Sequence, residues 1–257
     1  MSQPILTKDP SERAIKRRCL AIDTSGPFSS VALQSDNDGQ IYQLIGTAGN
    51  SHNEELAVLV EDVIEAAGIS AASISHLIVG SGPGSFTGLR IGFSFMKGLA
   101  YALRVPLRAA SSLEAMAYQF AGEFAGREVI FVSVADARSV GFFVGIYLLK
   151  ANGEMTTLRS PVIIGKMDLA GVVDEYRARC NISEEQVLII SQADTVLVGV
   201  DFAMRSATSP ATGMLKMFFQ EKDRRPIEIG SGVTWQELAL IQPEYIRAVA
   251  AKKISER

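Results

Sequence analysis

Cysteine and histidine are scarce in this sequence, which excludes several kinds of site. The 257 residues include two cysteines, Cys19 and Cys180, too far apart for a C-x-x-C motif and too few for a disulfide framework. A metal-binding pair on one helix would need a second ligand four residues after His52, where Leu56 stands. We therefore expect no metal site, and hydrolase chemistry is poorly supported, because neither histidine belongs to a recognisable triad.

An excess of charge of one sign and long apolar runs are also missing. Lysine and arginine number 25 against 28 acidic residues, giving a net charge of −3. Without a broad basic field, any RNA contact would be local or shared with a partner. No window is apolar for the roughly 20 residues of a membrane span, and the charged N-terminus lacks the features of a signal peptide. We expect a cytoplasmic protein that does not enter a membrane.

Two segments share one pattern of strands and turns. An apolar run ends at Asp23, and the following alternating stretch turns at Asp38-Gly39, which is typical of a hairpin. From residue 128 another apolar run ends at Asp136, followed by a strand and an Asn152-Gly153 turn. The similar spacing indicates a duplicated βββ-plus-helices unit. It predicts an α/β protein of two similar lobes, with both acids at the cleft between them.

A glycine-rich stretch follows the strand that ends near residue 80. "GSGPGSFTGLRIG" lacks the lysine of a nucleotide P-loop, since Leu89 follows Gly88, and Ser85 stands where a dinucleotide fingerprint needs its last glycine. Gly84, Gly88 and Gly92 recur every four residues on one helical face, which favours close packing against another backbone. The serine is a candidate cap for the helix, and free backbone N–H groups there could attract an anion.

Asp23-Thr24-Ser25 admits two interpretations. The three residues are typical of a turn in which the side chains bond to the local backbone. Alternatively, the carboxylate and hydroxyls suit phosphate and a water-bound Mg²⁺ ion. The second interpretation makes Asp23, Thr24, Ser25 and Asp136 candidate nucleotide-binding residues, and it supports a weak ATPase or kinase-like enzyme as an alternative function.

Several motifs together resemble one family. "LAIDTS", "GSGPGSFTGLRIGFSFMKGLAYAL", "AASSLEAMA" and "VADAR" occur in order between residues 19 and 138 and resemble the TsaB (YeaZ) family of the glycoprotease-like, TsaD-related superfamily. The resemblance implies two ribonuclease-H-like lobes, as in actin, sugar kinases and chaperone ATPases. We expect an N-terminal extension (1–16), a first lobe (17–114) joined by a C-terminal helix (234–257), and a second lobe (115–233).

The resemblance also implies a function. TsaB-like proteins are non-catalytic partners of TsaD and, with the ATPase TsaE, help form N6-threonylcarbamoyladenosine at tRNA position 37. The chain would then need no cofactor of its own, with ATP or ADP and Mg²⁺ acting at the complex. The catalytic relative carries an H-x-x-x-H pair where this chain has His52 and Leu56, so a metallopeptidase activity is the least supported alternative.

In the family, the helix corresponding to 53–67 and its neighbour from 85–103 pair with TsaD or with a second copy. The interface residues expected from this are His52, Leu56, Leu59, Val60, Val63, Gly84, Gly88 and Gly92. One segment departs from the family pattern: Ser139-Val140-Gly141-Phe142 follows Asp136-Ala137-Arg138. A ligand contact by that loop is therefore in doubt.

Overall fold

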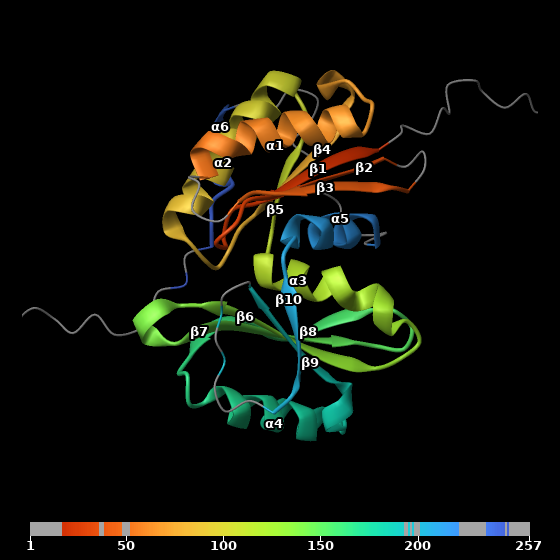
Figure 1. The fold of residues 1–257 in the computed structure, drawn as a ribbon, viewed down its shortest axis with the longest axis vertical. Coiled ribbons are helices and arrows are strands. Elements are labelled where there is room, and N and C mark those ends of the chain that lie inside the picture. The colour runs from red at the N-terminus through yellow and green to blue at the C-terminus, as the bar shows by residue number, and fades with distance from the viewer. Residues whose placement is uncertain are drawn as a thin grey trace, which may run out of the picture.

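Two five-stranded sheets form the framework of the protein (Figure 1). The computed structural model describes residues 17–35, 39–47, 52–192, 195, 197, 201–220, 235–244 and 246. The predicted extension 1–16, Asp38 and most of the C-terminal tail lie outside these residues. Among the described residues, no helix has the length and apolar character to cross a membrane.

The two sheets have the same strand order and the same strand directions. The first contains β1 (Arg18–Asp23), β2 (Ser30–Ser35), β3 (Ile41–Ile45), β4 (His76–Gly80) and β5 (Leu107–Ala110), in the order β3-β2-β1-β4-β5. The second contains β6 (Val129–Asp136), β7 (Phe142–Leu149), β8 (Met155–Ile164), β9 (Val187–Gln192) and β10 (Ala203–Ala207), in the order β8-β7-β6-β9-β10. Each unit begins with three antiparallel strands and adds two parallel ones. The predicted duplication is confirmed, and with it the two ribonuclease-H-like lobes.

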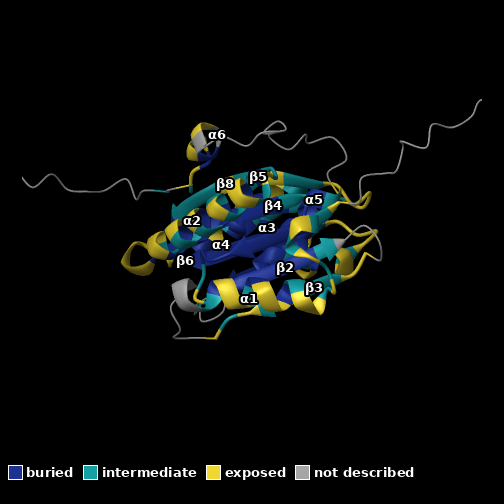
Figure 2. Cartoon of the chain, turned by 90° about the horizontal axis from the view of Figure 1, so that it is seen from above, coloured by how far each residue is buried: buried dark blue, intermediate teal, exposed yellow. Residues whose placement is uncertain are grey.

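The helices form three layers around the sheets (Figure 1). They are α1 (His52–Ala66), α2 (Phe86–Leu103), α3 (Ser112–Ala121), α4 (Leu169–Cys180), α5 (Pro210–Gln220) and α6 (Trp235–Leu240), with short 3₁₀ turns at Ala71–Ser73, Gly122–Phe124, Arg138–Val140 and Glu184–Gln186. Helices α1, α2 and α6 cover the outer face of the first sheet, and α4 covers the outer face of the second. Helices α3 and α5 lie between the sheets. Seen from above, the central strands are mostly buried, the edge strands β3 and β8 are largely half-buried, and the outer helices carry many exposed residues (Figure 2).

The two middle helices cross between the halves of the sequence. Helix α5 follows the second sheet along the chain, yet its Ala211, Met214 and Leu215 pack with Cys19 and Ile78 of the first. Helix α3 follows the first sheet and packs on the second, where its Leu113 and Met116 join the second core. The predicted boundary at 114/115 therefore falls inside α3, and α5 packs outside the lobe to which it was assigned. Periodicity shows that a helix is amphipathic but not which sheet it covers.

The contact between α3 and α5 is very close. A Cβ atom built on Gly213 of α5 would overlap the carbonyl oxygen of Ala115 in α3. Lys216 lies one turn further along α5 and donates to the carbonyl oxygen of Gln119 at 2.7 Å. Partial burial lowers the pKa of this lysine. The lobes are thus joined by a helix pair that has no room for a larger residue at its centre.

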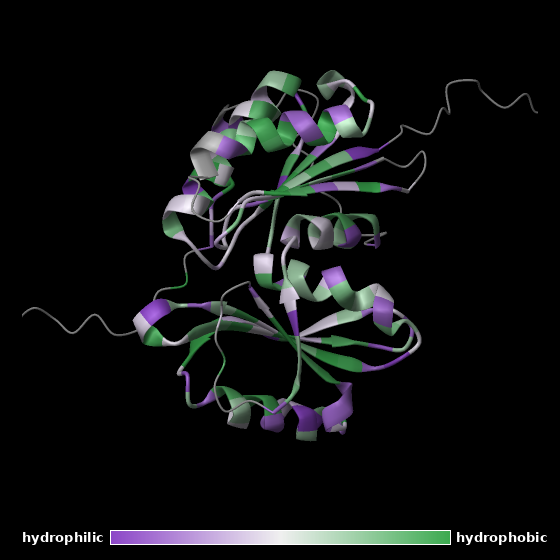
Figure 3. Ribbon diagram, in the orientation of Figure 1, coloured by the Kyte–Doolittle hydropathy of each residue, from purple (hydrophilic) through white to green (hydrophobic). Residues whose placement is uncertain are grey.

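The C-terminal helix is shorter than predicted. Helix α6 ends at Leu240, and the segment up to Glu244 is not helical, because Pro243 cannot continue a helix. Leu238 and Ile241 join the core of the first lobe, so this segment packs where we expected it. Outside the core, hydrophilic residues are frequent on α4, the outer helix of the second lobe (Figure 3).

Candidate functional site

The carboxylate at the end of β1 is bonded to the protein itself. Asp23 is 1% exposed, and its Oδ1 accepts hydrogen bonds from the Ser25 N–H (3.0 Å) and the Ser25 Oγ (2.7 Å). Its Oδ2 accepts from the Ser112 Oγ at 2.5 Å, and Ser112 begins α3. The Ser112 hydroxyl also accepts from the Gly82 N–H at 3.1 Å. Asp23 therefore ties the turn after β1 to the helix that crosses between the lobes.

Thr24 and the glycine row fix the start of α2. The Thr24 hydroxyl donates to the carbonyl oxygen of Gly88 at 2.7 Å, and a Cβ on Gly92 would overlap that hydroxyl. A Cβ on Gly84 would overlap the Ser25 carbonyl oxygen, to which the Ser85 N–H donates at 2.7 Å. The close packing predicted from the glycine spacing is confirmed. At Gly84 and Gly92 the partner is the turn after β1, so the chain itself uses these two positions, and the assignment of the three glycines to an interface with another protein stays a prediction.

The apolar stripe of α1 is likewise used inside the chain. Leu56, Val60 and Val63 are 1%, 5% and 0% exposed and belong to the core of the first lobe, and Leu59 is half-buried against it. The interface prediction is wrong for the three buried residues, because the same stripe covers the sheet. Leu56 cannot act as a metal ligand in place of histidine. The structure places His52 at the start of α1 and describes nothing of its side chain.

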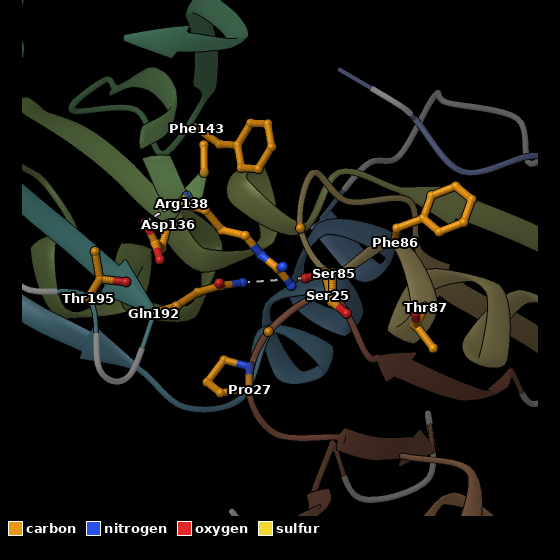
Figure 4. A pocket seen from close by; sticks show the side chains of 13 residues that line it. Ser25, Pro27, Ser85, Phe86, Thr87, Asp136, Arg138, Phe143, Gln192 and Thr195 are labelled. Carbon is orange, nitrogen blue, oxygen red and sulfur yellow. Dashed lines mark hydrogen bonds between the residues drawn. The ribbon is translucent and has the colours of Figure 1, made fainter. Parts of the chain in front are cut away.

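A cavity of about 680 Å³ lies between the lobes (Figure 4). Its described lining comprises Ser25, Gly26, Pro27, Gly84, Ser85, Phe86, Thr87, Asp136, Ala137, Arg138, Phe143, Gln192 and Thr195. Of the predicted nucleotide-binding residues, Ser25 and Asp136 reach this cavity, whereas Asp23 and Thr24 are not among its lining residues. Gln192 of β9 donates to the Ser25 Oγ at 3.4 Å, which links the two walls.

The turn after β6 supplies Arg138, a lining residue of the cavity that is not among the residues predicted from the sequence. The Asp136 Oδ1 accepts from the Arg138 N–H at 2.9 Å, and Arg138 has a φ of 63°. Its side chain extends into the cavity (Figure 4). The residues after Arg138, which depart from the family pattern, argue against a ligand contact by this loop, yet the loop lines the cavity. The sequence feature that could have indicated this residue is an arginine two positions after Asp136, the acidic residue that ends β6.

A second hollow, of about 470 Å³, lies on the outer side of α2. It is lined by Leu56, Phe86, Thr87, Arg90, Ile91, Ser94 and Phe95. The Phe86 side chain is 56% exposed, and the Arg90 Cζ lies 5.3 Å from the centre of its ring. Further along the same helix, Gly98 is exposed, and a Cβ there would have no atom within 4 Å. Nothing within the described chain requires a glycine at this position.

Known proteins match most of this chain. The family described as "TsaD: tRNA N6-adenosine threonylcarbamoyltransferase" matches residues 46–153. The Escherichia coli "tRNA threonylcarbamoyladenosine biosynthesis protein TsaB" is 28% identical over 237 residues, which cover 86% of this chain and 98% of that protein. The Bacillus subtilis protein of the same name is 33% identical over 51% of this chain and 55% of its own length. The solved structure "YeaZ from Pseudomonas aeruginosa" covers 90% of this chain and 100% of its own, with a TM-score of 0.65 and 24% identity, a likeness of fold.

Proposed function

We propose that this chain is a member of the TsaB (YeaZ) family, on its similarity to the Escherichia coli and Bacillus subtilis proteins, and that it serves tRNA threonylcarbamoyladenosine biosynthesis as a subunit without an active site of its own. The catalytic partner would be a TsaD-like protein. A TsaE-like ATPase and the tRNA would join through the complex, in the cytoplasm, with ATP or ADP and Mg²⁺ acting there. In isolation, a second copy could occupy the partner's place.

The observation that carries this proposal is the arrangement at the end of β1. A carboxylate that is to hold Mg²⁺ or orient a phosphate must reach the cleft with an oxygen, and Asp23 is 1% exposed. Both oxygens of Asp23 instead accept from Ser25 and Ser112, and Thr24 is bonded to α2. The ATPase alternative needs Asp23 and Asp136 at one site, which this arrangement does not provide. The metallopeptidase alternative loses its second ligand position to the buried Leu56.

The outer side of α2 is the surface on which we expect the partner to dock. It presents Phe86, Arg90 and the half-buried Ile91 and Phe95 around a hollow, with Gly98 further along. A glycine in a helix interior costs roughly 0.5–1 kcal/mol relative to alanine. Its small size allows another helix to approach closely. This surface takes the place of the buried Val60 and Val63 in the predicted interface, while Leu56 lines its hollow.

Gly98→Gln should abolish pairing without harming the free chain. Because the site is open, the glutamine should raise the free energy of unfolding by about 0.5–1 kcal/mol through its better helix propensity. Mixed with TsaD from the same organism, the wild type should form a heterodimer in light scattering, and the variant should remain unpaired. Gly171→Gln is the matched control, since Gly171 is exposed in α4 and equally open. A Gly98→Gln variant that still pairs would show that this face of α2 is not the interface, and a wild type that ignores TsaD would contradict the proposed function.

A further inference from the structure

Two side chains of opposite charge line the cavity between the lobes. Asp136 and Arg138 are the only Asp, Glu, Lys or Arg residues among the described residues that line it. The remaining side chains are hydroxyl groups, the Gln192 amide, a proline, an alanine and the rings of Phe86 and Phe143. Within the part of the chain that the structure describes, neither charged group takes part in an ion pair.

Backbone geometry keeps these two charges apart. One oxygen of Asp136 accepts from the backbone N–H of Arg138 at 2.9 Å, which holds the carboxylate against the turn. Arg138 itself has a φ of 63°, which is uncommon for a residue with a side chain. Figure 4 shows its side chain extending across the cavity toward Ser25 and Ser85, while Asp136 stays at the end of β6. The Arg138 guanidinium and the Asp136 carboxylate thus line the same cavity at different positions.

The two charged side chains of the cavity indicate which class of ligand fits it. The phosphates of a nucleotide carry several negative charges, and here they would meet one arginine together with the repulsion of Asp136. A ligand with one positive and one negative group matches both side chains. Guanidinium binds a carboxylate through two parallel hydrogen bonds, and a carboxylate accepts from an ammonium group. We propose that this cavity binds a free α-amino acid, with Arg138 holding its carboxylate and Asp136 its ammonium group.

Three uncharged residues of the cavity wall are held by hydrogen bonds before a ligand enters. Ser25 accepts from Gln192, which is 7% exposed, and donates to the buried Asp23. Ser85 caps α2 by accepting from the Gly88 N–H at 3.2 Å. A site that is already ordered loses little entropy on binding. Serine and threonine hydroxyls also line the cavity, which favours an amino acid with a polar side chain. This inference goes beyond the proposed function and does not depend on it.

Titration calorimetry on the full chain with L-threonine tests the proposal. Arg138→Gln and Asp136→Asn should each weaken binding at least about tenfold, because each removes one charge-assisted contact. N-acetyl-threonine lacks the ammonium group, so it should bind wild type and Asp136→Asn equally. Threonine amide lacks the carboxylate, so it should bind wild type and Arg138→Gln equally. Combining a change in the protein with a change in the ligand, as in a double-mutant cycle, isolates the binding free energy of each contact.

Arg127→Gln and Asp174→Asn, at exposed positions away from the cavity, serve as controls and should bind threonine as the wild type does. The proposal is overturned if threonine, serine and glycine all fail to bind the wild type, or if both cavity variants bind unchanged. Binding of ADP without binding of any amino acid would also overturn it and would indicate a nucleotide site. If a variant fails to fold, the wild type alone decides: N-acetyl-threonine and threonine amide should each bind at least about tenfold more weakly than threonine, and equal binding of all three would overturn the proposal. None of these outcomes alters the expected pairing with TsaD.

Discussion

Asp23→Ala should lower the free energy of unfolding by about 3–5 kcal/mol, because the Ser25 N–H and the Ser25 and Ser112 hydroxyls would lose their acceptor in a buried place. Asp136 occupies the equivalent position at the end of β6 but is exposed. Asp136→Ala removes one exposed hydrogen bond and should change the free energy of unfolding by less than about 1 kcal/mol. The same substitution at two related positions should therefore have very different effects.

Urea unfolding of the two variants, followed by circular dichroism, measures this difference. Ser112→Ala adds a test of the crossing contact and should cost about 1–3 kcal/mol, since the Asp23 carboxylate and the Gly82 N–H both lose a partner. If Asp23→Ala lowered the free energy of unfolding as little as Asp136→Ala is expected to, the result would contradict a structural role for Asp23. It would also reopen the assignment of Asp23 to ligand binding.

The second large effect is expected at the helix pair between the lobes. Gly213→Ala should lower the free energy of unfolding by about 3 kcal/mol or more, because the new Cβ would overlap the Ala115 carbonyl oxygen and α5 would have to move away from α3. Alanine is the better helix former, so intrinsic propensity alone predicts the opposite sign. The sign of the measured change thus distinguishes packing from propensity.

Gly122→Ala provides the matched control for this helix pair. Gly122 caps the end of α3 with a φ of −64°, and a Cβ there would have no atom within 4 Å. Its substitution should leave stability unchanged or raise it by less than about 1 kcal/mol. A stabilising Gly213→Ala measured by thermal and urea unfolding would show that α3 and α5 are not packed this closely in solution.

Much of the fold could be predicted from the sequence, since the evidence for it is local. The turn at Asn152-Gly153 is confirmed between β7 and β8, where Gly153 has a φ of 85°. The equivalent positions of Asp23 and Asp136 correctly indicated the duplication. The destination of α5 was not predictable in this way. Its apolar face is equally suited to either sheet, and only the complete arrangement decides between them.

A local pattern likewise does not identify what a residue at the site packs against, and this explains the predictions that differ from the structure there. Leu56, Val60 and Val63 form an apolar stripe, and a stripe has the same appearance whether it faces the sheet below or a partner outside. The glycine row correctly predicted a close approach but could not identify what approaches. For Asp23, the sequence left turn chemistry and ligand binding open, and the structure favours the first through Ser112, a residue 89 positions away. No local pattern could have revealed that contact.

The crossing of α3 and α5 has a consequence for synthesis on the ribosome. The inner face of the first sheet, with Ala21, Ala32 and Ile78, is covered by a helix made roughly 100 residues after the sheet is complete. At about 5–20 residues per second, this apolar face waits several seconds for its cover. The first half of the nascent chain thus exposes this apolar face until α5 is made, and the two lobes reach their final form together.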